Sequence, residues 1–134
     1  MRLGHIYHKI QNMTRVFIAN PNADECSALR LMLQDLRMEV VGNALEWPLV
    51  IASVPVTRPD ILLVDWELLP ADPAAHLLAL RRNCSTPFFT VLTSYLDARQ
   101  QAATSVGADA FISKFEAPNR LADRLLVIAK SLDA

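Results

Sequence analysis

Three polar side chains of this sequence each follow a short apolar run, and their types suit the binding of a phosphoryl group. Asp65 follows the run ILLV, Thr93 follows FFTVL, and Lys114 follows AFIS. Such runs are typical of buried parallel strands, whose carboxyl ends meet at the sheet edge where α/β proteins place their ligands. We therefore expect a carboxylate, a hydroxyl and an ammonium to converge there. The carboxylate can accept a phosphoryl group as a nucleophile, and the other two groups can bind its oxygens.

The elements that must position these side chains alternate along the chain as five strands and five helices. The expected strands span residues 15–19, 39–42, 61–64, 88–92 and 110–113. The expected helices span residues 23–37, 47–54, 73–82, 97–106 and 117–132. Continuous apolar strands indicate burial on both faces by covering helices. The sequence thus predicts an α/β fold: a flavodoxin-like, doubly wound, five-stranded parallel sheet in the order 2-1-3-4-5, with the short second strand at an edge.

Local signals set the ends of several of these helices. Asn22 is suited to N-cap the first helix. Pro48 fits the first turn of the second helix, and Pro55 is expected to end it. Gly107 suits the left-handed residue that closes the fourth helix. The apolar stripe that the last helix should bury consists of Leu121, Leu125, Ile128 and Leu132.

Length and composition restrict the class of protein. The 134 residues suit one domain, which we place at residues 14–134 after a flexible leader at 1–13. A hydrophobic content of 52% excludes a disordered chain, and a net charge of −1 gives no support for direct nucleic-acid binding. No apolar run approaches the roughly 20 residues that cross a bilayer. Cys26 and Cys84 match no metal or redox spacing, which favours reduced thiols in a cytoplasmic protein.

From about residue 15 to residue 132 the chain resembles a response-regulator receiver domain of two-component signalling. The resemblance rests on the order and spacing of the motifs ILLVD, VLTS and GADAFISK, with the tripeptide RPD before the third strand. It implies that Asp65 is the phosphoacceptor and that Thr93 and Lys114 contact the phosphoryl oxygens. It also implies that Thr93 and the aromatic residue Phe111 form a conformational switch.

The resemblance further implies partners and a cellular role. The expected partner is a histidine kinase or another signalling protein, in a phosphorelay linked to transcription regulation. A homodimer would use the helix at 97–106, the strand at 110–113 and the helix at 117–132. Neither direct nucleic-acid binding by this domain nor membrane association is expected. Any enzymatic activity is at most self-phosphoryl transfer onto Asp65, without turnover of a separate substrate.

The chain departs from the family where a magnesium ion should bind. Receivers have two adjacent acidic residues after the first strand, and Asn20 and Pro21 stand there instead. Loss of two carboxylates should make Mg²⁺ binding weak or absent and impair the phosphoryl transfer that depends on it. The remaining metal ligands would be Asp65 and, weakly, Glu67. Asp24 better fits the first turn of a helix, where an acid favours the helix dipole.

Two smaller departures concern the loops around the same edge. Phe115 follows Lys114, where many receivers have a cis proline, and a cis bond before phenylalanine is improbable. Tyr95 follows Thr93 by two residues, and we expect it to cover the mouth of the site.

Two hypotheses about function stay open, and a third is disfavoured. We favour an atypical receiver that works mainly as a protein-interaction module, with a retained aspartate and impaired Mg²⁺-dependent phosphorylation. The alternative is a conventional receiver that a histidine kinase phosphorylates on Asp65. A flavodoxin-like enzyme or nucleotide binder would need a glycine-rich or hydroxyl-rich phosphate loop after the first strand, and the sequence there is NPNA.

Overall fold

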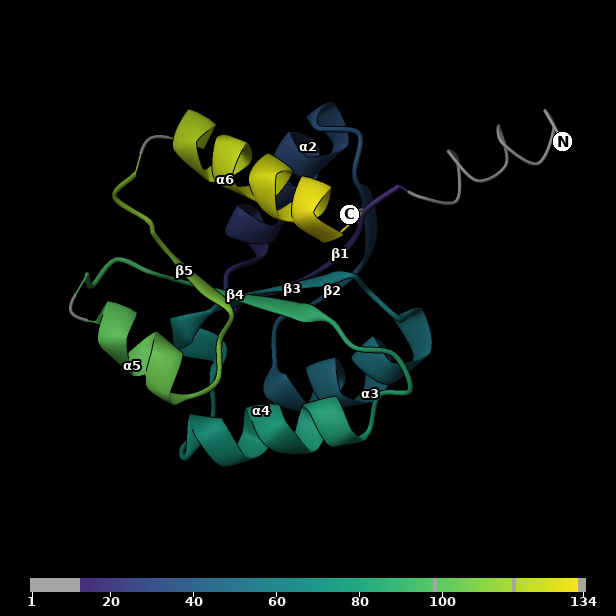
Figure 1. Ribbon diagram of the computed structural model, residues 1–134, viewed down its shortest axis with the longest axis vertical. Helices are drawn as coiled ribbons and strands as arrows, with labels where there is room; N and C mark the ends of the chain where they lie inside the picture. The colour runs from purple at the N-terminus through teal and green to yellow at the C-terminus, as the bar shows by residue number, and fades with distance from the viewer. Residues whose placement is uncertain (1–12, 98, 117, 133–134) are drawn as a thin grey trace, which may run out of the picture.

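The computed structural model describes residues 13–97, 99–116 and 118–132, which alternate between strands and helices (Figure 1). The strands are β1 (Arg15–Ala19), β2 (Glu39–Ala44), β3 (Ile61–Asp65), β4 (Phe89–Ser94) and β5 (Ala110–Ser113). The α-helices are α2 (Ala23–Asp35), α3 (Trp47–Thr57), α4 (Pro73–Arg82), α5 (Arg99–Ser105) and α6 (Pro118–Leu132). A short 3-10 helix, η1 (Trp66–Leu68), follows β3. Nearly all of the leader expected at 1–13 lies outside the described residues.

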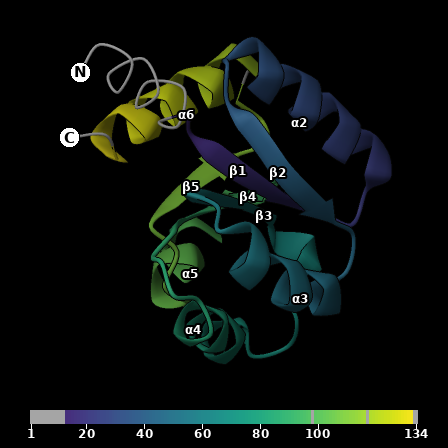
Figure 2. The ribbon, with the colours of Figure 1, turned by 90° about the vertical axis from the view of Figure 1, so that its right-hand side faces the viewer.

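The five strands form one parallel sheet in the order β2-β1-β3-β4-β5, which confirms the predicted fold class. Helices α2 and α6 cover one face of the sheet, and α3, α4 and α5 cover the other (Figures 1 and 2). β2 lies at an edge of the sheet, as predicted, but it is not short: it continues to Ala44, two residues past its expected end. The chain reverses its direction of winding between β1 and β3, so the carboxyl ends of these two strands flank the crevice where such sheets bind ligands.

The sheet divides the interior into two apolar cores, and β3 contributes alternate residues to each. Ile61 and Leu63 pack beneath α2 and α6, whereas Leu62 and Val64 pack beneath the other three helices. All five residues of β3 are buried. Full burial of such a side chain stabilises a fold by about 1.5–3 kcal/mol, so this strand is a rigid support for the polar residue at its end.

Three strands, β2, β3 and β4, extend further toward the functional edge than the sequence predicts. Asp65 is the last residue of β3 and pairs with Thr93 of β4, which continues to Ser94. The sequence prediction ended β3 at residue 64 and β4 at residue 92, where the apolar runs stop. These ends were wrong, because a polar side chain does not interrupt the backbone pairing of neighbouring strands. The two residues therefore have the fixed geometry of a sheet.

The prediction that Pro55 ends α3 was also wrong. The helix continues to Thr57 and closes at Arg58, which has a left-handed backbone with φ of 50°. Proline costs only one helical hydrogen bond this close to the helix end. The fully buried Val54 anchors the last turn in the core. The side chain of Thr57 adds a bond to the carbonyl of Ser53 at 2.9 Å.

The other boundaries differ from the prediction by small amounts that have local causes. α2 ends at Asp35 rather than 37, because Arg37 takes a left-handed backbone with φ of 60°. Gly107 has φ of 93° after α5, as predicted. Leu132 is 42% exposed, so its expected burial was wrong. The packing of α6 against the core ends at Ala129.

Two further observations concern the class of protein. Cys26 is buried on α2 and Cys84 is half-buried, and both thiols are free. Within the described residues, no helix combines the length and the apolar character that crossing a lipid bilayer requires.

Candidate functional site at the carboxyl edge of the sheet

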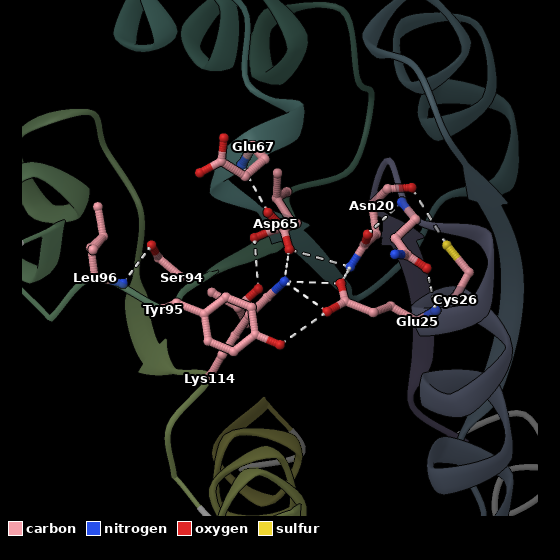
Figure 3. Close-up of polar contacts among 12 residues, drawn as sticks. Asn20, Glu25, Cys26, Asp65, Glu67, Ser94, Tyr95, Leu96 and Lys114 are labelled. Carbon is pink, nitrogen blue, oxygen red and sulfur yellow. Dashed lines mark hydrogen bonds and ion pairs between the residues drawn. The ribbon is translucent and has the colours of Figure 1, made fainter.

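Asp65 is the centre of the site, and its carboxylate is almost completely buried, with 3% exposure. One oxygen, Oδ1, accepts a hydrogen bond from the backbone N–H of Glu67 at 2.8 Å, since Asp65 caps the short helix η1. The other oxygen, Oδ2, forms an ion pair with the ammonium of Lys114 (Figure 3). Asp65 and Lys114 therefore meet as the sequence indicates, although they are far apart along the chain.

Lys114 follows β5, and the backbone of β4 positions it. Its N–H donates a hydrogen bond to the carbonyl of Ser94 at 2.8 Å, which extends the pairing of the two strands by one residue. The Nζ atom lies 2.9 Å and 3.1 Å from the two carboxylate oxygens of Glu25. It also lies 4.9 Å from the centre of the Tyr95 ring. The ammonium thus contacts two carboxylates and one aromatic face.

Glu25 is the residue of the site that sequence reasoning missed. It lies in the first turn of α2, and its backbone N–H donates to the side chain of the cap residue Asn22 at 3.0 Å. An acid three residues after an Asn cap is the capping-box pattern, and it was available in the sequence. Glu25 also precedes Leu29 by four residues, so the two lie on one face of the helix. The spacing to Leu29 places Glu25 on the face of α2 that packs on the sheet. The capping box itself is not closed, because the backbone N–H of Asn22 binds Asn20 Oδ1 and the Glu25 carboxylate binds Lys114 instead.

Asn20 and Pro21 replace the expected acidic pair, and Asn20 lies in the centre of the site with 2% exposure. Its amide nitrogen donates to Glu25 Oε2 at 2.7 Å and approaches Asp65 Oδ2 at 3.4 Å. Its amide oxygen accepts from the backbone N–H of Asn22 at 2.8 Å. These partners fix the orientation of the amide, so that Asn20 presents N–H donors to the two carboxylates.

This donor set does not fit a divalent cation. Mg²⁺ requires carboxylate or carbonyl oxygens in an octahedral shell. Here the amide oxygen of Asn20 points away from the carboxylates, and the Lys114 ammonium lies between Asp65 and Glu25. Among the residues that the structure describes, no group of three or more acidic, histidine or cysteine side chains is arranged to bind a metal.

Glu67 and Asp24, the other two acids weighed from the sequence, both lie outside this network. Glu67 is an exposed residue whose carboxylate pairs with Arg99 at 2.7 Å. The guanidinium of Arg99 also lies 5.2 Å above the ring of Trp66. Asp24 is exposed in the first turn of α2, where it suits the helix dipole. The weak metal-binding role of Glu67 stays a prediction, and no local pattern in the sequence singled out Arg99.

The two residues predicted to form the switch, Thr93 and Phe111, lie on the neighbouring strands β4 and β5. Thr93 pairs with Asp65 across the strands, and its hydroxyl donates a long hydrogen bond to the carbonyl of Val64 at 3.5 Å. Phe111 is half-buried and packs against the core on the side of α3, α4 and α5. Their roles in binding phosphoryl oxygens and in switching remain predictions.

A cavity of about 250 Å³ opens over the site. Its lining residues come from the last residues of β3 and β4, from the segments that follow β1, β4 and β5, and from α2, η1 and α5: Asn20, Pro21, Asn22, Glu25, Asp65, Glu67, Ser94, Tyr95, Leu96, Arg99 and Lys114. Tyr95 is 52% exposed at the rim and packs edge-on against Phe115 at 5.3 Å between ring centres. Tyr95 therefore lines the cavity over the site, while its predicted effect on access stays a prediction.

The ion pairs shift the pKa values of both side chains that bind each other. Burial alone would raise the pKa of Glu25, but hydrogen bonds from Lys114 and Asn20 and the charge of Lys114 lower it below its ordinary 4.5. Burial alone would lower the pKa of Lys114, but hydrogen bonds and charges from Asp65 and Glu25 raise it above its ordinary 10.5. Both groups are therefore held in their charged forms at neutral pH.

Comparison with known proteins identifies the fold. No protein-family model and no curated protein sequence matches the chain. Among solved structures, it is similar to a two-component response regulator from Clostridium difficile, with a TM-score of 0.78 and 18% identity over 91% of this chain and 100% of that one. It is also similar to the receiver domain of the putative response regulator NarL from Mycobacterium tuberculosis, with a TM-score of 0.75 and 23% identity over 88% and 97% of the two chains. The receiver domain of RstA from Klebsiella pneumoniae is similar too, with a TM-score of 0.74 and 20% identity over 87% of this chain and 98% of that one. The chain has the receiver fold.

Proposed function

We propose that this chain is a signalling receiver of an atypical kind, which works mainly as a protein-interaction module. The observation that supports this most is the Lys114 ammonium between Asp65 and Glu25, in a site where Asn20 presents an amide N–H. The charge of the acceptor is balanced by a side chain, without a divalent ion. Phosphoryl transfer relies on such an ion to neutralise developing charge. We therefore expect Asp65 to accept a phosphoryl group weakly or not at all.

The partners in this proposal are a histidine kinase or another signalling protein, or a second copy of the chain, all in the cytoplasm. The surface proposed for docking is formed by α5, β5 and α6. A cavity of about 410 Å³ in this surface supports the proposal, and Phe111 and Phe115 contribute to its lining. Phe115 is 73% exposed, and a large exposed aromatic side chain is typical of interface residues.

The metal-dependent part of the proposal is tested by chemical phosphorylation. Wild-type protein and the variant Asp65→Asn are incubated with acetyl phosphate, with and without millimolar Mg²⁺, and their intact masses are compared. We expect no Mg²⁺-dependent mass increase in either protein. A stoichiometric phosphoryl adduct on wild type that is lost in Asp65→Asn would contradict the proposal and support the second candidate below.

The interaction surface is tested by the association of the chain with itself. Sedimentation equilibrium over rising concentration is measured for wild type and for Phe115→Ser. We expect dimers of wild type to weaken on this substitution. The control is Val56→Ser on α3, which removes a side chain of 79% exposure outside the proposed surface. An equal effect of both substitutions would argue against α5, β5 and α6 as the interface.

The second candidate is a conventional receiver that a histidine kinase phosphorylates on Asp65. The specific observation in its favour is that Asp65 and Lys114 form an ion pair while Thr93 lies opposite Asp65 in the strand pairing. In this case the chain would at most transfer a phosphoryl group onto itself, without turnover of a separate substrate.

A further inference from the structure

We propose that Glu25 is a built-in anion of this site: its carboxylate binds the Lys114 ammonium in the place that a phosphoryl oxygen on Asp65 would need. The site is then closed to phosphoryl groups by Glu25 itself, in addition to the loss of the acidic pair. This inference rests on the proposed function and names the residue that keeps the acceptor inactive.

The first argument is that Glu25 and Asp65 together use the hydrogen-bonding capacity of Lys114 fully, with two of the three bonds going to Glu25. An ammonium has three N–H donors and no acceptor. Two acceptors are the carboxylate oxygens of Glu25, at 2.9 Å and 3.1 Å, and the third is Oδ2 of Asp65. No donor is left for an additional oxygen. An oxyanion that is to bind Lys114 must therefore displace Glu25.

The second argument is that donors from three separate loops fix the Glu25 carboxylate. Besides Lys114 after β5, the amide of Asn20 after β1 donates to Oε2 at 2.7 Å. The hydroxyl of Tyr95 after β4 lies 3.5 Å from Oε1 (Figure 3). Charge-assisted hydrogen bonds such as those from Lys114 are shorter and about twice as strong as neutral ones. The carboxylate is thus part of the built site and not a solvated surface group.

The third argument concerns charge. Glu25 and Asp65 contribute two negative charges around the single positive charge of Lys114, so this group of three residues has a net charge of −1. An incoming phosphoryl donor is an anion and is repelled by that excess. Removal of Glu25 would make the group neutral and free two N–H donors at once.

Release of the site requires only a change of side-chain conformation. The backbone N–H of Glu25 is bound to the cap residue Asn22, so the first turn of α2 stays in place. The side chain of Glu25 is 31% exposed, and it can rotate toward solvent without disturbing the core. The inference therefore concerns a contact that can open while the fold remains intact.

The experiment separates Glu25 from the missing acidic pair. The variant Asn20→Asp/Pro21→Asp restores the two acids, and Mg²⁺ binding is measured by calorimetry. We expect this variant to bind Mg²⁺ and yet to be modified slowly at Asp65 by acetyl phosphate. Addition of Glu25→Ala should raise the modification rate about tenfold, the factor expected from loss of one charge-assisted interaction. The control adds Asp24→Ala instead, which removes an exposed acid from the same turn of α2.

A second measurement does not depend on restoring the metal site. The rate at which an amine-acylating reagent modifies Lys114 is measured by peptide mass spectrometry in wild type and in Glu25→Ala. Circular dichroism checks that both are folded. We expect faster acylation in Glu25→Ala, because the ammonium of Lys114 loses one of its two carboxylate partners, deprotonates more easily to the reactive amine and becomes more accessible to the reagent. The variant Asp24→Ala should react like wild type.

The outcomes distinguish this inference from the proposed function. Modification of wild type at Asp65 by acetyl phosphate and Mg²⁺ would overturn both. A second outcome is that wild type is not phosphorylated, while Asn20→Asp/Pro21→Asp is phosphorylated as fast with Glu25 as with Glu25→Ala. This outcome would overturn the role of Glu25 and leave the proposed function standing. If Asn20→Asp/Pro21→Asp does not bind Mg²⁺, the inference is tested by the acylation of Lys114. An acylation rate that is the same in Glu25→Ala and in wild type would overturn it.

Discussion

The carboxyl edge of the sheet has two halves, and they differ in how many of the residue types expected in a phosphoryl-accepting site they retain. The half formed by β3, β4 and β5 has the expected residue types, Asp65, Thr93 and Lys114. The half formed by β1 and α2 has Glu25, whose carboxylate binds the Lys114 ammonium, and Asn20, whose amide N–H donates to that carboxylate. The comparison teaches that retained residues do not by themselves preserve a site, because their neighbours decide which charges they bind.

The two ion pairs over the cavity show the same contrast in burial. Asp65 and Lys114 have side-chain exposures of 3% and 16%, whereas Glu67 and Arg99 have 67% and 25%. Removal of one partner from a buried pair leaves an uncompensated charge, while an exposed pair is replaced by water at small cost. Substitutions in the two pairs should therefore differ widely in effect.

The largest effect is expected for Lys114→Ala, which leaves the carboxylates of Asp65 and Glu25 facing each other without a cation. We expect a loss of about 3 kcal/mol in the free energy of unfolding, measured by urea denaturation. The control is Lys130→Ala, on an exposed position of α6. Equal free energies of unfolding for the two variants would contradict a large contribution of the Asp65–Lys114 ion pair to stability.

The next effect is expected for Asn20→Asp, which removes an N–H donor and adds a third carboxylate to the site beside those of Asp65 and Glu25. The free energy of unfolding without metal should fall by about 1–2 kcal/mol. Millimolar Mg²⁺ should recover part of this loss in thermal unfolding. Asn22→Asp is the matched control, since aspartate is an equally good helix cap and the position is exposed. Destabilisation by both substitutions alike would contradict the special position of Asn20.

A smaller effect should appear in the pH dependence of stability, compared between wild type and Glu25→Gln. The lowered pKa of Glu25 adds stability above its ordinary 4.5, and this is lost as pH falls through the folded value. The raised pKa of Lys114 adds stability below its ordinary 10.5, and this is lost as pH rises further. The difference between the proteins should be constant near neutral pH and shrink in acid. Urea denaturation at pH 3 to 7 measures it, and a difference that grows in acid would contradict the assigned sign.

The smallest effect is expected for Glu67→Gln, which breaks the exposed pair with Arg99. We expect a change below about 0.5 kcal/mol in urea denaturation, and less in high salt. A loss as large as that of Lys114→Ala would remove the contrast between the two pairs.

The fold was predictable from the sequence because the features that determine it are local. Continuous apolar runs such as 61–64 identify buried strands, and Asn22 and Gly107 mark helix ends by their backbone preferences. The prediction that Pro55 ends α3 was wrong, because the energetic cost of a proline depends on how far it lies from the end of the helix. The position of that end depends on the burial of Val54 in the core. Burial of Val54 is a tertiary property that the local pattern does not contain.

The site was predictable only in part, for a related reason. Asp65 and Lys114 end separate strands, so the topology alone brings them together. The partner of Lys114 is Glu25, which is 89 residues away and belongs to a helix. Its role depends on the rotation of α2 about its axis, which the packing of Cys26 and Leu33 determines. Sequence reasoning examined Asp24 and Glu67 instead, and both face away from the ammonium.

Trp66 gives this edge of the molecule its own optical probe. Trp66 is the residue after Asp65, and its indole ring lies under the guanidinium of Arg99. The chain's other tryptophan, Trp47, is 7% exposed on α3. A protein with Trp47→Phe would therefore have a single fluorophore, and its emission would report any rearrangement of charge beside Asp65 without an added label.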